Sequence, residues 1–175
     1  MPNVFATVGT TSFDALIRRL DSPELHKILC DQLGYHGLVM QIGRGDYEPV
    51  AHTARDYPLE GRFSVSYYRF KPSLAADIAA AGLVISHAGA GSVLESLNAG
   101  KRLLVVVNDD LMHNHQTELA HRVARDGHLD TTVCVDLEDA LKRLTPVSQL
   151  KPFPRGEPEK FAKFLDSVMG FGDGD

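Results

Sequence analysis

"VISHAGAGSVLESLNAGK", residues 84–101, is the stretch that decides the fold. A short apolar run leads into small residues, and an amphipathic segment then ends at Gly100, which predicts a strand, a tight loop and a helix. Gly89 and Gly91 lack the Cβ atoms that would hold a ligand away from the backbone. Ala88 and Ala90 keep the same surface low. The loop therefore predicts an anion site at a helix N-terminus, with close packing of the loop on the sheet as the alternative.

Similar apolar runs recur along the chain and predict further strands. They cover residues 4–8, 38–42, 83–86 and 103–107, with a weaker candidate at 131–135 and an alternating one at 63–70. Helical patterns cover residues 12–20, 23–33, 74–81, 93–99, 115–125 and 137–144. Strands that are apolar on both faces and alternate with helices predict an α/β fold with a mostly parallel sheet.

The composition is that of one globular domain. The chain has 175 residues, of which 43% are hydrophobic and 23% are charged. The net charge of −5 argues against a general nucleic-acid-binding protein. Cys30 and Cys134 lie in apolar surroundings and are expected to be reduced core residues. We expect no signal peptide and no membrane span, because neither pattern occurs in the sequence.

Three parts follow one another along the chain. Residues 1–145 are expected to form the α/β domain, residues 146–157 an extended proline-rich connector, and residues 158–170 an amphipathic helix. That helix carries an apolar stripe of Phe161, Phe164, Leu165 and Val168. The stripe either packs back on its own domain or docks on a partner. The segment 43–61 is polar and is expected to be a long loop.

Four polar loops follow predicted strands, so in a parallel sheet they meet at one edge, where ligands bind in such folds. Their candidate ligand-binding residues are Gly9, Thr10, Thr11, Gly43, Arg44, Ala88, Gly89, Ala90, Gly91, Ser92, Asn114, His115 and Gln116. The threonine hydroxyls can donate to a phosphate. Arg44 either balances a phosphate or is simply solvated. The pattern from Asn114 to Gln116 predicts either groups that hydrogen-bond a sugar or an ordinary helix start with Asn114 as its cap.

Ser92 and Glu95 have the spacing of a capping box, in which each would satisfy a backbone N–H at the helix start. The same Glu95 could instead accept both hydroxyls of a ribose. Ser12 is expected to cap the first helix. The acids and histidines near residue 110 fit no standard zinc spacing, so no metal and no cofactor are expected. A P-loop, a dinucleotide fingerprint and a nucleophile elbow are also missing from the sequence.

Several motifs in order resemble a known family. They are "FATVGTTSFDALI" (residues 5–17), "QIGRG" (41–45), the stretch 82–92, "ESLNAGK" (95–101) and "NHQTELA" (114–120). Together they resemble the donor-binding subunit of the two-part UDP-N-acetylglucosamine (UDP-GlcNAc) transferase of dolichol-linked oligosaccharide synthesis. That subunit is in turn similar to the C-terminal domain of glycosyltransferase family 28. The resemblance extends from Val4 to about Met169, and the insert at 46–62 and the tail after Phe171 match no motif.

The resemblance implies a Rossmann-like fold that forms one half of a GT-B glycosyltransferase. The family's chain is cytoplasmic, and a membrane-anchored acceptor-side subunit recruits it to the cytosolic face of the endoplasmic reticulum. The resulting heterodimer adds the second GlcNAc, in a β1,4 link and with inversion, to GlcNAc-diphosphodolichol, and needs no metal. The alternative is a non-catalytic nucleotide-sugar-binding or scaffolding module. A stand-alone enzyme of this fold usually needs about twice this length of chain.

Roles carried over by position complete the expectations. Gly9 to Thr11 and Ala88 to Ser92 would hold the diphosphate, Glu95 the ribose, and Asn114 to Gln116 the GlcNAc. The C-terminal stripe would face the partner subunit. An inverting transfer also needs a general base. His87 is a weak candidate, because in a split enzyme the base could belong to the partner.

Overall fold

The structure is a computed structural model that describes residues 2–53, 62–108 and 115–154. Two groups of predictions fall outside this range. Asn114 lies outside it, as do the side chains of His115 and Gln116, although the backbone of these two residues is described. The C-terminal stripe also lies outside it, namely Phe161, Phe164, Leu165 and Val168.

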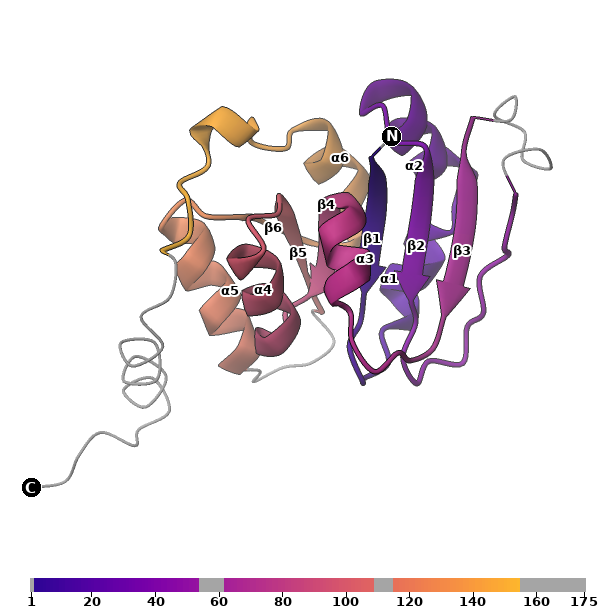
Figure 1. The fold of residues 1–175 in the computed structure, drawn as a ribbon, viewed down its shortest axis with the longest axis horizontal. Helices are drawn as coiled ribbons and strands as arrows, with labels where there is room; N and C mark the ends of the chain where they lie inside the picture. Colours follow the sequence, from indigo (N-terminus) through magenta and orange to yellow (C-terminus); the bar gives the residue numbers. More distant parts are fainter. Residues whose placement is uncertain (1, 54–61, 109–114, 155–175) are drawn as a thin grey trace, which may run out of the picture.

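Within the described residues, six strands form one parallel sheet in the order β3-β2-β1-β4-β5-β6 (Figure 1). The strands are β1 Asn3–Thr7, β2 Gly37–Gln41, β3 Ser64–Tyr68, β4 Ala81–His87, β5 Leu103–Val107 and β6 Asp130–Val133. The predicted α/β class with a mostly parallel sheet is confirmed. The β6 prediction ran too far, because Cys134–Asp136 turns into a 3-10 helix. The β4 prediction was too short at both ends.

Six α-helices and one π-helical segment lie between or after these strands in the described chain, apart from two short 3-10 helices. They are α1 Asp14–Leu20, α2 Pro23–Lys27, the π-helical segment Ile28–Gln32, α3 Ala75–Ala80, α4 Ala90–Asn98, α5 His115–Arg125 and α6 Leu137–Lys142. The predicted helix at 23–33 is thus α2 continued by a wider turn, and Ser22 caps it by accepting the Leu25 N–H at 3.3 Å. Ser12 does not cap α1, because the helix begins one residue later and Phe13 is its N-cap.

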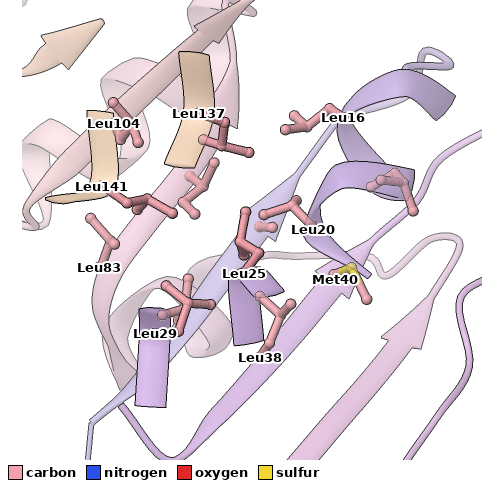
Figure 2. Packing of buried hydrophobic residues seen from close by; sticks show 14 of the residues in the cluster. Leu16, Leu20, Leu25, Leu29, Leu38, Met40, Leu83, Leu104, Leu137 and Leu141 are labelled. Atoms are coloured by element: carbon pink, nitrogen blue, oxygen red, sulfur yellow. The ribbon is translucent and has the colours of Figure 1, made fainter. Parts of the chain in front are cut away.

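The helices cover both faces of the sheet and bury two separate cores. One core, shown in part in Figure 2, packs α1, α2, the π-helical segment and α6 against the sheet through leucines such as Leu16, Leu29 and Leu137. The other packs α3, α4 and α5 against the opposite face through Ile78, Leu97 and similar residues. Burial on both faces explains why the central strands are apolar throughout.

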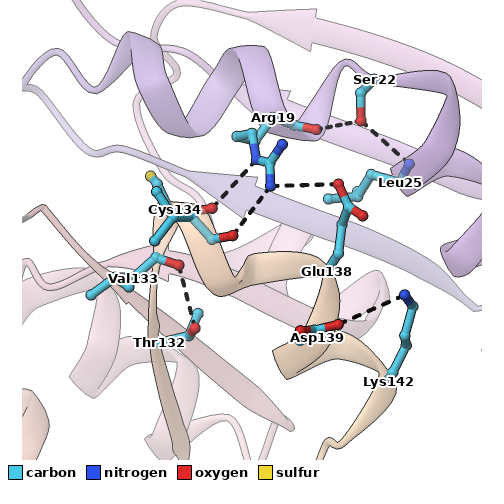
Figure 3. A network of polar contacts seen from close by, with 10 residues as sticks. Arg19, Ser22, Leu25, Thr132, Val133, Cys134, Glu138, Asp139 and Lys142 are labelled. Carbon is cyan, nitrogen blue, oxygen red and sulfur yellow. Dashed lines mark hydrogen bonds and ion pairs between the residues drawn. The ribbon is translucent and has the colours of Figure 1, made fainter.

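Arg19 connects α1 with the turn that enters α6 (Figure 3). Its guanidinium donates to the carbonyls of Cys134 and Val135 at 3.4 and 3.3 Å and lies 3.5 Å from the Glu138 carboxylate. The ion pair is partly exposed, so it contributes little, on the order of 0–1 kcal/mol. The carbonyl contacts fix where α6 lies on the sheet. Neither Cys134 nor Cys30 forms a disulfide among the described residues; Cys30 is buried as expected of a core residue, whereas Cys134 is only half-buried.

The connecting segments differ from expectation in two places. The polar loop after β2 reaches the outer edge of β3, where His52 forms an antiparallel bridge with Val65. The connector after residue 145 contains the short 3-10 helix Val147–Gln149, so it is not extended throughout. Its described part ends at Pro154.

Candidate functional site

The candidate site lies where strand order reverses. β1 and β4 are neighbours in the sheet, but β1 leads to β2 on one side and β4 leads to β5 on the other. The loops that leave β1 and β4 therefore diverge and open a crevice at the carboxyl edge, which is where ligands bind in open α/β sheets. The structure thus brings Gly9 and Gly89 to the same crevice, as the sequence predicts.

The His87 imidazole fills the space between these two glycines. A Cβ atom added to Gly9 would lie 2.7 Å from His87 Cε1, and one added to Gly89 would lie 2.2 Å from His87 Nε2. Gly9 also adopts φ +63°, which disfavours any other residue. Both glycines are therefore required by His87 itself. The prediction that they serve ligand access missed this packing role.

The environment of His87 defines its protonation. Its Nδ1 lies 3.3 Å from the Thr7 carbonyl, which can only accept, so Nδ1 carries the hydrogen. Burial lowers the pKa of His87, and the Thr7 carbonyl opposes this only in part. The ring is thus a neutral imidazole at neutral pH, with the Nε2 lone pair beside Gly89. A group of this kind can accept a proton, which is the property that a general base needs.

Gln41 is a site residue that the sequence reasoning missed. Its side-chain oxygen accepts from the Gly9 N–H at 3.1 Å and from the Thr7 hydroxyl. Its side-chain nitrogen donates to the Gly9 carbonyl at 2.6 Å and to the Arg69 carbonyl at 3.1 Å. The buried Gln41 amide thereby fixes the loop after β1 by bonding both the N–H and the carbonyl of Gly9. The sequence does contain an indication of this role. Gln41 is a polar residue in an otherwise apolar strand, and a buried polar side chain needs hydrogen-bond partners.

The loop after β2 lies against the loop after β1. The Arg44 N–H donates to the Thr11 carbonyl at 3.0 Å. A Cβ on Gly43 would lie only 2.2 Å from that same oxygen, and its φ of +60° also requires glycine. The Thr11 hydroxyl donates to the Val8 carbonyl at 2.9 Å, so in this structure it serves the turn. The side chains of Thr10 and Arg44 are exposed at the edge, where a ligand can reach them.

Arg69, which follows β3, is a second cation that sequence reasoning did not assign to this edge. Its guanidinium donates to the carbonyls of Gly43 and Gly45 at 3.3 and 2.8 Å and pairs with Glu48 at 2.7 Å. It shapes the Gly43 loop and already has a carboxylate partner. Arg44 is therefore the better candidate for a phosphate.

Helix α4 begins earlier than the capping-box pattern predicts. Gly89 is the N-cap and no side chain caps the helix, so Ser92 lies in the first turn instead of at the cap. The capping box is thus wrong, and Glu95 lies exposed on the helix one turn further on. Among the described residues, no atom beyond the helix's own backbone and the two chain neighbours lies within 4 Å of a Cβ added to Gly91, so this part of the described helix surface is open. Free N–H groups at an open helix N-terminus can bind an anion.

Two further properties concern the described residues only. No three His, Cys, Asp or Glu side chains are grouped there so that they could hold a metal ion. No helix within the same ranges is long and apolar enough to cross a bilayer.

Comparison with known proteins agrees with this architecture. The family model of the glycosyltransferase family 28 C-terminal domain matches residues 3–167. The chain is 50% identical over 135 residues to the UDP-N-acetylglucosamine transferase subunit ALG13 of Homo sapiens, covering 77% of this chain and 11% of that protein. It is 34% identical to the subunit of the same name in Candida glabrata, covering 95% of this chain and 98% of that protein. The chain thus spans only about a tenth of its human relative.

Solved structures show the same fold. A solution structure of ALG13 has a TM-score of 0.68 at 28% identity and covers 94% of both chains. The crystal structure of Acinetobacter baumannii MurG has a TM-score of 0.61 at 22% identity, covering 86% of this chain and 43% of MurG. The sheet is like one half of a GT-B glycosyltransferase, as predicted. The chain therefore belongs to the glycosyltransferase family 28 C-terminal domain family, and it is similar to relatives named UDP-N-acetylglucosamine transferase subunit ALG13.

Proposed function

We propose that this chain is the UDP-GlcNAc-binding subunit of a heteromeric inverting glycosyltransferase. The enzyme would add the second GlcNAc in a β1,4 link to GlcNAc-diphosphodolichol, the precursor of N-glycans. Relatives that carry the name of a UDP-N-acetylglucosamine transferase subunit support the donor and the need for a partner. The observation that carries the proposal is the crevice between β1 and β4, where the start of α4 has no side-chain cap and its N-cap, Gly89, lies against the His87 ring.

The donor would lie across this crevice. Its diphosphate would contact the N–H groups at Gly91 and Ser92, together with Thr10 and the Arg44 guanidinium. The open surface at Gly91 supports this placement, because nothing there would block a phosphate. Glu95 would accept the ribose hydroxyls, since the capping role no longer competes for its carboxylate.

The transfer needs two contributions from protein groups. The acceptor hydroxyl oxygen attacks the GlcNAc anomeric carbon, the bond from that carbon to the diphosphate oxygen breaks, and UDP leaves. The α4 N-terminus and Arg44 would stabilise the charge that develops on the leaving diphosphate. A base must take the hydroxyl proton. His87 Nε2 is the candidate on this chain, and a base on the partner is the alternative. We propose no metal for this reaction.

The partner would be a membrane-anchored subunit that supplies the acceptor side. It would recruit this chain from the cytoplasm to the cytosolic face of the endoplasmic reticulum. The stripe Phe161, Phe164, Leu165 and Val168 would contact it; these residues lie outside the described part of the chain.

Calorimetric titration with UDP-GlcNAc and a transfer assay with the partner subunit test the proposal. Binding should occur, and transfer to a lipid-diphosphate-GlcNAc acceptor should require both chains. Gly91→Ala and Glu95→Gln should weaken donor binding, whereas Glu24→Gln, the same change as Glu95→Gln on an exposed residue of α2, should not. Donor binding without any transfer in the presence of the partner would favour the non-catalytic binding module. A complete lack of donor binding and transfer would refute both.

A further inference from the structure

A second concave site lies at the opposite, amino-terminal edge of the sheet. It is a pocket of about 280 Å³ between the end of α4 and the segment 147–153. Lys101, Arg102 and Lys151 line it, and among the described residues no aspartate or glutamate does. The site proposed for the sugar nucleotide is at the carboxyl edge, so the two are separated by the length of the strands.

Local backbone structure places these cations together. Gly100, at φ +67°, ends α4: its N–H donates to the Leu97 carbonyl at 2.9 Å, and the Lys101 N–H donates to the Ser96 carbonyl at 3.0 Å. This is the hydrogen-bond pattern of a Schellman motif, and it directs Lys101 and Arg102 into the pocket rim.

Lys151 reaches the pocket from the connector. Its N–H donates to the Gly127 carbonyl at 2.9 Å, and its carbonyl lies 2.9 Å from His128 Nδ1. Its aliphatic stem lies over Gly127, with the Cγ, Cδ and Cε atoms 3.6–3.7 Å from where a Cβ would be. Phe153 packs edge-on against the His128 ring and holds this segment in place.

The cations are anchored but not neutralised. The Lys101 ammonium donates to the carbonyls of Ala79 and Ala81 at 2.6 and 3.0 Å, and Arg102 donates to the Thr145 carbonyl at 2.5 Å. Arg102 Nε is buried and has no hydrogen-bond partner among the described residues. Within the same residues, none of the three lining cations forms an ion pair. A chain with a net charge of −5 thus leaves three positive charges together without a carboxylate.

We propose that this pocket binds a phosphate group, either on a soluble compound or on the headgroup of an anionic lipid. A phosphate offers several strong acceptor oxygens, which suits a pocket whose lining includes three cationic side chains. The rest of the lining includes the apolar side chains of Leu97, Leu150 and Phe153 beside the polar Asn98 and His128. Val147, which also lines the pocket, is 65% exposed. The phosphate carrier therefore has an apolar part next to the phosphate.

Titration of the full chain with inorganic phosphate, followed by amide chemical shifts, tests the site. Saturable shifts are expected at Lys101, Arg102 and Lys151. Lys151→Gln should weaken phosphate binding about three- to tenfold, because it removes one charge-assisted contact that is partly screened by solvent. Lys151 is exposed, so the fold should tolerate this change. Lys27→Gln removes the same charge from an exposed residue of α2 and should leave the affinity unchanged.

Co-sedimentation with vesicles separates the two sources of phosphate. A lipid headgroup is supported by two results together. The chain binds vesicles of phosphatidylcholine with phosphatidic acid but not vesicles of phosphatidylcholine alone, and Lys151→Gln abolishes this binding. Saturable phosphate binding without vesicle binding supports a soluble compound. The proposal is overturned if phosphate causes no saturable shifts, or if Lys27→Gln and Lys151→Gln weaken binding equally. The pocket is remote from the carboxyl edge, so phosphate binding here and donor binding there are measured in separate experiments. Failure of either proposal leaves the other unaffected.

Discussion

The packing of His87 between two glycines predicts a large difference between two similar substitutions, Gly89→Ala and Gly91→Ala. The Cβ added at Gly89 would lie 2.2 Å from His87 Nε2, whereas ordinary contacts begin at 3.4 Å, so the ring must withdraw by more than 1 Å. Gly9 blocks it on the other side, and withdrawal stretches the contact with the Thr7 carbonyl. Overpacking costs about 1–3 kcal/mol and the weakened hydrogen bond about 1 kcal/mol. Gly89→Ala should therefore lower the free energy of unfolding by about 2–4 kcal/mol.

Gly91→Ala is the matched control, two residues along the chain. Its Cβ meets nothing within 4 Å, and alanine is the better helix former. The free energy of unfolding should stay unchanged or rise by up to about 1 kcal/mol. If the donor lies at Gly91 as proposed, this variant should nevertheless lose donor affinity, because the methyl group occupies the approach of the phosphate.

Urea unfolding followed by far-ultraviolet circular dichroism measures both variants, since the chain has no tryptophan. A double-mutant cycle with His87→Ala isolates the contact. In that background Gly89→Ala should cost only about 0.5–1 kcal/mol, because the space for its methyl group is then empty and only the poorer N-cap of alanine remains. Equal costs of Gly89→Ala in the two backgrounds would refute the packing argument, as would a Gly89→Ala variant as stable as Gly91→Ala.

Three further predictions follow from contacts described above. Gln41→Leu should lower the free energy of unfolding, measured with urea, by at least about 2 kcal/mol. The reason is that leucine leaves the Gly9 N–H and carbonyl without the hydrogen bonds that the Gln41 amide provides. A loss below about 0.5 kcal/mol would contradict these hydrogen bonds. Glu95→Gln should change the same free energy by less than about 0.5 kcal/mol while weakening UDP binding about tenfold in calorimetry; a loss of stability without a loss of affinity would restore the capping role. Burial lowers the pKa of both His26 and His87, so on acidification these histidines bind protons in the unfolded chain before they do in the folded chain. The free energy of unfolding, measured by urea unfolding at several pH values, should therefore fall as the pH drops below about 6.5. A pH dependence of this free energy that is unchanged by His87→Gln would contradict the prediction.

Much of the fold follows from patterns that are local in sequence. The apolar run at β5 predicts that strand with its observed bounds, and the α5 helix likewise matches. Each pattern is complete within a few residues, since strand burial and helix periodicity are both local signals. The convergence of the loops after β1, β2 and β4 followed once the sheet was taken as parallel.

The start of α4 could not be obtained in this way. Ser92 and Glu95 have the spacing of a capping box, but the start of the helix is set by the residue at which the preceding strand, β4, ends. β4 continues to His87 because His87 pairs with Val106 of β5, a partner 19 positions away. Only two residues then separate strand and helix, so the helix starts at Ala90. Tertiary pairing thus overrides the local cap signal.

The polar framework of the site was also hidden from local reasoning. Gln41 is the last residue of β2 and Arg69 follows β3, so both lie near the predicted loop residues. Their roles, however, depend on hydrogen-bond partners that belong to other strands and loops. Gln41 contacts residues 32 positions before it and 28 positions after it. Such partners are set by strand order, which a single sequence does not specify.

The contact between His87 and the Thr7 carbonyl joins residues 80 positions apart. Contacts of such separation form slowly because a long stretch of chain must first be ordered. A nascent chain that has emerged from the ribosome only as far as β3 contains Gly9 and Gln41 but not His87. The β1 loop then lacks the side chain that its glycine accommodates until β4 is synthesised and docks against β1. Docking of β4 against β1 and assembly of the candidate site are therefore a single event during synthesis, and a chain stalled before β4 cannot bind the donor in the proposed way.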